Sequence, residues 1–73
     1  MKEQDFEKLA LAFDAVFDNE GEIKACGRAT CMDLISLMKK YSSKDVGDEK
    51  TGNINLETMR NEYLRILRAY LRG

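Results

Sequence analysis

The side chains in this sequence that could do chemistry are carboxylates, thiols and guanidinium groups, because the chain contains no histidine. Histidine is the commonest general base, the usual partner of a catalytic serine or cysteine, and the commonest metal-binding side chain. A nucleophile, a base and an oxyanion donor cannot be assembled from the remaining residue types. The composition therefore predicts a protein that is not an enzyme and that carries no cofactor and no metal ion.

The only thiols belong to Cys26 and Cys31, which are too few for a disulfide scaffold or a four-thiolate zinc site. The two cysteines are five residues apart, so on one continuous helix their side chains would point about 140° apart. We therefore expect the thiols to stay separate and each to behave as a small apolar side chain. Free, reduced thiols favour the cytoplasm as the location of the protein.

Carboxylates recur at helical spacing near the N-terminus. Glu7, Asp14 and Asp18 fall on one stripe of a helical wheel with Leu11 beside it, about 100° or more from the apolar face. Acid catalysis would need a buried carboxyl group with a raised pKa, whereas this stripe faces solvent. The stripe is either a solvated acidic face or a docking surface for a basic protein, with Leu11 as its apolar anchor.

A second candidate surface lies in the middle of the chain. Arg28, Met32 and Lys39 share one arc of a helical wheel, and Ile35 borders that arc. Exposed apolar side chains framed by basic ones are typical of a contact with another protein or with a second copy of the chain. A broader helical core would instead bury Ile35 without any partner.

Arginines form the third candidate surface. Arg65, Arg68 and Arg72 are three and four residues apart, on the side of a helix opposite Met59 and Tyr63. Such a row could contact phosphates without reading a base sequence. The pI of about 5.4 is far below that of a dedicated nucleic-acid binder. Nucleic-acid binding through these arginines is therefore the alternative function, because arginines near a helix C-terminus also interact favourably with the helix dipole.

Residues 17–23 and 48–54 each combine acidic residues, a glycine and an isoleucine two residues after that glycine. This spacing resembles that of the paired calcium loops of the EF-hand family, which need a carboxylate at the first position and a glutamate at the twelfth. Aligned on the two glycines, those ligand positions are occupied by Val16 and Gly27, and by Gly47 and Thr58. We therefore expect poor calcium affinity, while a short strand pairing of Ile23 with Ile54 stays open.

The elements that position these groups follow from the apolar periodicity. Apolar residues recur at three- and four-residue steps in three segments, which predicts helices over about 2–18, 23–42 and 56–71. Gly27 and Thr30 weaken the prediction for the start of the second helix. The sequence predicts an all-α fold, a small three-helix bundle in which residues 1–73 form a single helical domain. Whether the connection over 44–55 pairs with residues 19–25 stays open.

Composition limits the class of protein further. The chain has 73 residues, of which 44% are apolar and 34% charged, with a net charge of −1, as expected for one small domain. No apolar run approaches the roughly 20 residues that cross a bilayer, and the N-terminus lacks the apolar core of a signal peptide. We therefore expect no membrane partner. The function that the sequence favours is a small accessory or regulatory module that binds another protein or a second copy of itself.

Overall fold

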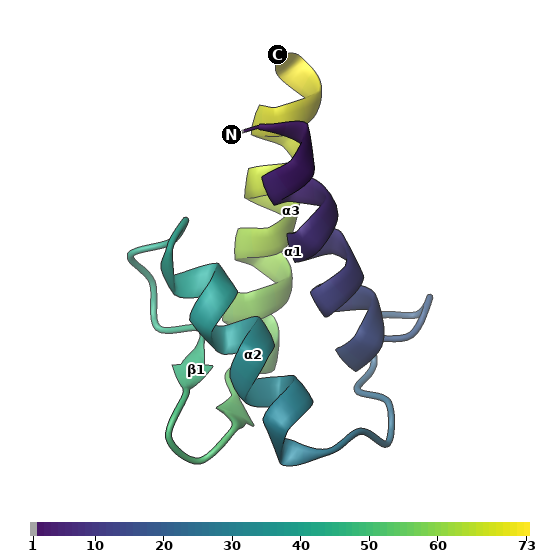
Figure 1. Cartoon of the computed structure of the whole chain (residues 1–73), viewed down its shortest axis with the longest axis vertical. Helices are drawn as coiled ribbons and strands as arrows, with labels where there is room; N and C mark the ends of the chain where they lie inside the picture. Colours follow the sequence, from purple (N-terminus) through teal and green to yellow (C-terminus); the bar gives the residue numbers. More distant parts are fainter. Residues whose placement is uncertain (1) are drawn as a thin grey trace.

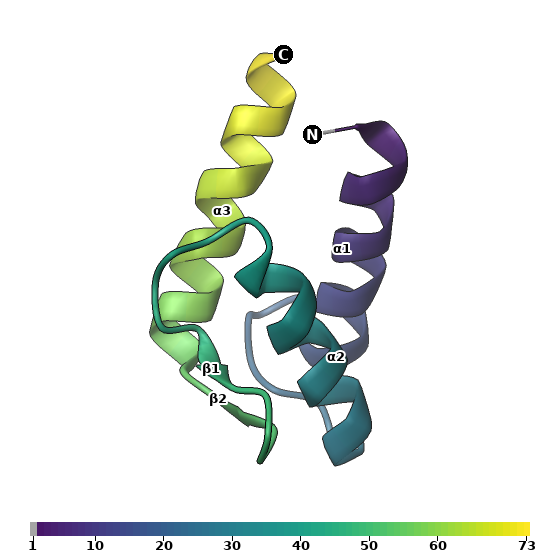
Figure 2. The same ribbon diagram turned by 60° about the vertical axis from the view of Figure 1, so that its left-hand side comes forward.

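The computed structural model describes residues 2–73, which form three helices and one β-hairpin (Figure 1). The elements in chain order are α1 (Glu3–Val16), α2 (Arg28–Lys39), β1 (Gly47–Asp48), β2 (Asn53–Ile54) and α3 (Leu56–Arg72). Helices α1 and α3 run antiparallel, and α2 crosses their lower half (Figures 1 and 2). The prediction of three helices is confirmed, whereas the hairpin was not expected, so the fold is mainly rather than purely α-helical.

Helix α2 is shorter than predicted at both ends, and it starts late because the residues before it make a different backbone pairing. Phe17 and Ile23 form an isolated antiparallel bridge, in which the Lys24 amide donates to the Val16 carbonyl at 2.7 Å. That bridge ends α1 and holds residues 18–22 as a loop. Gly27 then serves as the N-cap residue of α2. The Glu22 carbonyl, which would accept the first hydrogen bond of a helix starting at residue 23, instead accepts from the Asp18 amide at 2.8 Å.

The hairpin before α3 depends on glycine. Gly47 pairs with Ile54 in the antiparallel register, and Gly47 has a φ of 151°. A Cβ atom at Gly47 would lie 2.6 Å from the Asn53 carbonyl oxygen and 3.0 Å from a methyl carbon of Ile35. Only glycine therefore allows β1 to approach both β2 and α2 this closely. The pairing of Ile23 with Ile54 that the sequence left open does not occur.

One apolar core joins all the elements. Its buried members are Leu9, Val16, Phe17, Leu34, Ile35, Met38, Val46, Met59 and Ile66. Between α1 and α3 the contact is aromatic: the Phe13 and Tyr63 rings stack with centroids 3.9 Å apart, and those of Phe6 and Tyr70 with centroids 4.3 Å apart. Stacked aromatic rings bury a large apolar area with a defined geometry. These rings bridge α1 and α3, while α1 packs most closely on α2, and the opposite face of α1 is left toward solvent.

Candidate interaction surfaces

The outer face of α1 carries what we call the acidic surface, which consists of Glu7, Leu11 and Asp14. Leu11 is 71% exposed, and both carboxylate residues are exposed. Neither Glu7 nor Asp14 takes part in an ion pair within residues 2–73. The nearby Lys24 ammonium donates to the backbone carbonyl of Asp14 at 2.6 Å, not to its carboxylate. The structure therefore places these three predicted residues on one exposed side of α1, and neither carboxylate is ion-paired within residues 2–73. Asp14 lies at the edge of this side nearest α3, because burial, and then the Asp14 charge, raise the pKa of Tyr63.

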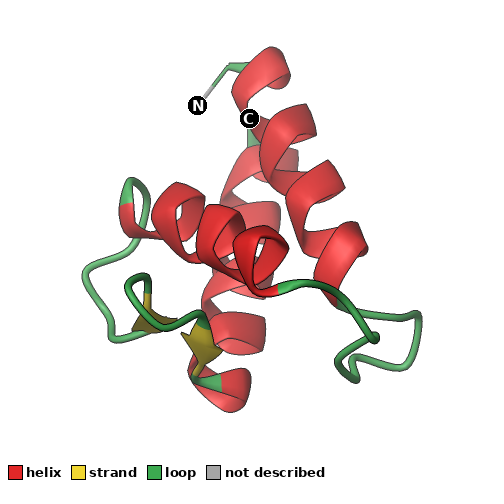
Figure 3. Ribbon diagram, turned by 60° about the horizontal axis from the view of Figure 1, so that its bottom comes forward, coloured by secondary structure: helices red, strands yellow, loops and turns green. Residues whose placement is uncertain are grey.

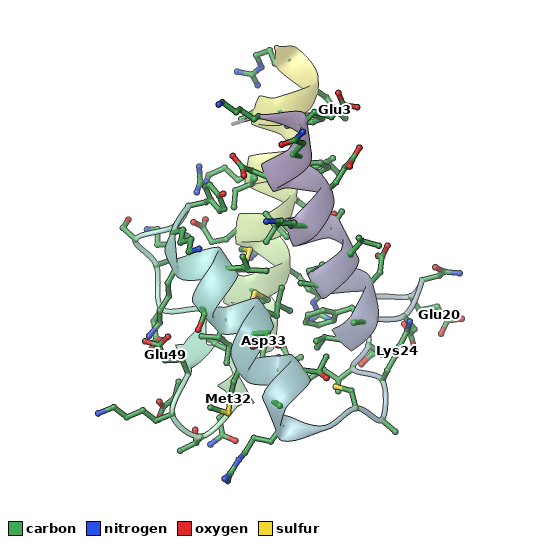
Figure 4. All side chains as sticks on the ribbon, viewed as in Figure 1. Glu3, Glu20, Lys24, Met32, Asp33 and Glu49 are labelled. Atoms are coloured by element: carbon green, nitrogen blue, oxygen red, sulfur yellow. The ribbon has the colours of Figure 1, made fainter. Side chains whose placement is uncertain are left out.

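Asp18 does not belong to this surface, contrary to the sequence prediction. It lies beyond the end of α1, and its Oδ1 atom accepts hydrogen bonds from the amides of Glu20 and Glu22 at 2.9 and 3.0 Å. This carboxylate stabilises the loop after α1, in the manner of an Asx turn. Figure 4 shows Glu20 at the tip of that loop and Glu3 at the opposite end of α1, both pointing into solvent. Asp18 is thus a loop-forming residue.

The second predicted surface, on α2, is covered by the hairpin, which lies alongside that helix (Figure 3). Ile35 is completely buried, with a methyl group against Gly47. Met32 is half-buried, and it faces the hairpin near Gly52 (Figure 4). The prediction that Ile35 contacts a partner or a second copy is therefore wrong, because the chain's own hairpin packs on it.

The basic residues of this α2 face also contact the hairpin. The Lys39 ammonium lies 3.6 Å from a carboxylate oxygen of Glu49, and Ser36 donates a hydrogen bond to the other oxygen of Glu49 at 2.9 Å. The aliphatic part of Arg28 approaches Gly52 so closely that a Cβ there would lie 2.7 Å from Arg28 Cγ. These side chains hold the hairpin against α2. The second candidate surface is thus mainly an internal contact.

Three of the four arginines of α3, namely Arg65, Arg68 and Arg72, lie around one shallow hollow of about 260 Å³, which Ala69 also lines. Arg65 is already engaged: its Nη2 atom is 3.2 Å from Glu62 Oε1 and 2.9 Å from the Tyr41 carbonyl oxygen. Arg68 and Arg72 form no ion pair within residues 2–73. The structure therefore brings the predicted arginines together but leaves two of them, rather than three, free for an anion.

Glu62 holds a charged cluster that the sequence reasoning missed. Ser42 and Arg65 donate hydrogen bonds to its carboxylate, which is largely buried. The hydrogen bond from Ser42, and then that from Arg65, lower the pKa of Glu62 below its usual range. Ser42 is twenty residues away in the chain, so no local pattern predicts this contact. The cluster ties the segment after α2 to α3.

Leucines that the sequence reasoning did not single out are exposed on α3. The exposed set consists of Leu56, Leu64 and Leu71. Their spacings of eight and seven residues are each close to two helical turns, so one side of the helix presents them all. Leu71 also borders a hollow of about 640 Å³ beyond the end of α2, together with Tyr41, Ile66 and Tyr70. The spacing of these leucines was the sequence signal that could have revealed this face.

The two thiols lie together, contrary to the prediction that they stay apart. The Sγ atoms of Cys26 and Cys31 are 3.5 Å apart, and both cysteines are free and half-buried. The prediction assumed one continuous helix, whereas α2 begins at Arg28 and Cys26 precedes it. Burial, and then the hydrogen bond with Cys26, raise the pKa of Cys31.

Across residues 2–73 no group of three or more cysteine, aspartate or glutamate side chains could hold a metal ion. None of the helices in that range has the length and apolar character needed to cross a membrane. The geometry thus offers surfaces and a pair of thiols.

Comparison with protein-family models, with curated proteins and with solved structures finds no match to this chain.

Proposed function

We propose that this protein is a non-enzymatic binding module and that the acidic surface of α1 takes a basic segment of another protein. The observation that carries the proposal is Leu11, which is 71% exposed between two carboxylates that lack ion-pair partners within residues 2–73. An exposed leucine between negatively charged residues fits a partner that offers an apolar pocket surrounded by lysine or arginine side chains.

The helix behind the acidic surface supports a binding role. Phe6 and Phe13 stack on α3, and Leu9 is fully buried, so the inner face of α1 is fixed. A partner that binds the outer face therefore meets side chains on a rigid helix and does not have to order them first. Full burial of Leu11 contributes about 1.5–3 kcal/mol, and the carboxylates add charge complementarity that guides association.

The test uses the full chain and a synthetic amphipathic peptide of lysines and leucines as a basic probe, with binding followed by calorimetry. We expect Leu11→Ser to weaken the Kd about tenfold or more, and Glu7→Gln with Asp14→Asn to weaken it further at low salt. The matched control is Leu71→Ser, because Leu71 is 72% exposed but lies on α3. Equal losses for Leu11→Ser and Leu71→Ser, or no binding by the wild-type chain, would contradict the proposal.

A second candidate function is weak binding of nucleic acid through Arg68 and Arg72, favoured by the hollow that they line together with Arg65. Fluorescence polarisation with generic duplex DNA and RNA at low and moderate salt tests it. Arg68→Ala with Arg72→Ala should weaken binding and reduce the salt slope by about 2, since each lost phosphate contact removes about 0.9. Absence of binding at low salt would remove this candidate.

A further inference from the structure

The two cysteines meet where the extended segment before α2 enters the helix. Cys26 lies in that segment, Cys31 is the fourth residue of α2, and their Sγ atoms are 3.5 Å apart. The turn between them is held by its backbone, because the Gly27 carbonyl accepts hydrogen bonds from the amides of Thr30 and Cys31 at 3.1 and 3.3 Å. The fold therefore keeps the two sulfur atoms adjacent without a covalent bond.

We propose that Cys26 and Cys31 form a dithiol site that reacts with low-molecular-weight disulfides, of which oxidised glutathione is one, to give an intrachain disulfide. The sulfur atoms then move from 3.5 Å to a bond length of about 2.0 Å. Because the intervening turn is already ordered, the closing step does not have to bring two distant parts of the chain together.

The reaction consists of two exchange steps. The Cys26 thiolate attacks one sulfur atom of the reagent, forms a mixed disulfide and releases the first reagent thiolate. The Cys31 thiolate then attacks the Cys26 sulfur, forms the intrachain bond and expels the second reagent thiolate. Two protein thiols are thereby oxidised and one reagent disulfide is reduced. The protons that Cys26 and Cys31 give up are taken by the two released thiolates.

The surroundings of Cys31 favour its role as the second thiol to react. The Cys31 pKa is raised by burial and by its hydrogen bond with Cys26, so this thiol is mainly protonated at neutral pH. The thiolate is the nucleophile in disulfide exchange. Burial and the contact with Cys26 therefore disfavour a first attack by Cys31, while its sulfur atom, 3.5 Å from that of Cys26, is in place to resolve the mixed disulfide.

The experiment treats the full chain with oxidised glutathione and then counts thiols and measures the intact mass. We expect the wild-type chain to lose both thiols, to lose two hydrogens in mass and to retain no glutathione. Cys26→Ser and Cys31→Ser should each lose their one thiol and retain one glutathione, because neither has a resolving thiol. Circular dichroism of both variants checks that they fold, and the wild-type result stands whether or not they do.

A wild-type chain that retains glutathione, or that forms a disulfide between two chains, would overturn the proposal. Phenylarsine oxide gives an independent measure of adjacency, because it condenses with two neighbouring thiols and releases one water. We expect one arsenic atom on each reduced wild-type chain and none retained on either serine variant. A wild-type chain that retains no arsenic would also overturn the proposal.

Discussion

Glutamate side chains are usually exposed, but Glu62 on α3 is largely buried and lies between Ser42 and Arg65. Hydrogen bonds to the ionised form favour it, which is why the pKa is lowered although burial alone would raise it. A lowered pKa in the folded chain means that ionised Glu62 stabilises the fold. That stabilisation is complete above the pKa of an unfolded glutamate, about 4.3, and is lost as the pH falls through the folded value.

The first prediction therefore concerns Glu62→Gln. We expect this variant to have a lower Tm than the wild type at pH 7, because the amide cannot replace the ionised carboxylate that accepts from Ser42 and Arg65. The difference should shrink as the pH falls below about 4. Thermal unfolding followed by circular dichroism at pH 7 and at pH 3 measures it. The control is Glu7→Gln, an exposed carboxylate on α1, which should change the Tm little at either pH.

Residue-scale features were predictable only where they depend on helical spacing. Leu11, Glu7 and Asp14 lie where the helical wheel placed them, because α1 forms over nearly the whole predicted range. Glu62 was not predictable, because its partner Ser42 is distant in sequence. The cysteine contact was not predictable either, because it depends on where α2 begins, and helix boundaries are set partly by tertiary pairing.

At the scale of elements, the hairpin of β1 and β2 is the part of the fold that changes the assignment of the α2 surface. It covers Ile35 and Met32, which a helix considered alone would have exposed. Two-residue strands carry almost no periodic signal, so the sequence predicts only a connection over 44–55. Val46, which is completely buried, is the residue of that connection that belongs to the core.

The second prediction is that Gly47→Ala strongly destabilises the protein. An alanine methyl group would clash with the Asn53 carbonyl oxygen and would force an unfavourable φ, so we expect a loss of about 2 kcal/mol or more in the free energy of unfolding. Urea unfolding measures this loss. A variant as stable as the wild type would show that β1 does not approach β2 as described.

The third prediction is that a substitution at Gly27 stabilises the protein, in contrast to the destabilisation expected at Gly47. Gly27 is the N-cap residue of α2, has a φ of −72° and makes no side-chain capping bond, and a Cβ atom added there would meet no other atom within 4 Å. We expect Gly27→Ser to raise the free energy of unfolding by about 0.5–1 kcal/mol, because serine caps a helix and restricts the unfolded chain. Urea unfolding of this variant alongside Gly47→Ala gives the comparison.

At the scale of the whole molecule, the chain is as compact as expected but exposes more surface. Its radius of gyration is 11.3 Å, against about 11 Å expected for this length. Its accessible surface is 5038 Å², against about 4,600 Å² for a monomer of this mass. Helix α3 is about 25 Å long and α2 only about 18 Å, and α2 crosses only the lower half of α3 (Figure 1). Periodicity predicted these helices, but not the surface that their unequal lengths expose.

The fourth prediction concerns global stability and rests on the proposed dithiol site. A disulfide between Cys26 and Cys31 closes a six-residue loop, for which the chain-entropy relation gives about 2 kcal/mol of stabilisation. We expect the Tm of the oxidised chain to rise by about 10 °C, with recovery of the original value after reduction. Cys26→Ser, treated in the same way, should show no rise. An oxidised chain that melts at or below the temperature of the reduced chain would contradict this prediction.

The aromatic stack between α1 and α3 gives the molecule an optical reporter. The chain has no tryptophan and three tyrosines, and two of these, Tyr63 and Tyr70, stack on phenylalanines of α1. Rings held in a fixed asymmetric array produce circular dichroism in the near ultraviolet, which free rings do not. Loss of that signal while the far-ultraviolet helix signal persists would therefore record the separation of α1 from α3, without any added dye.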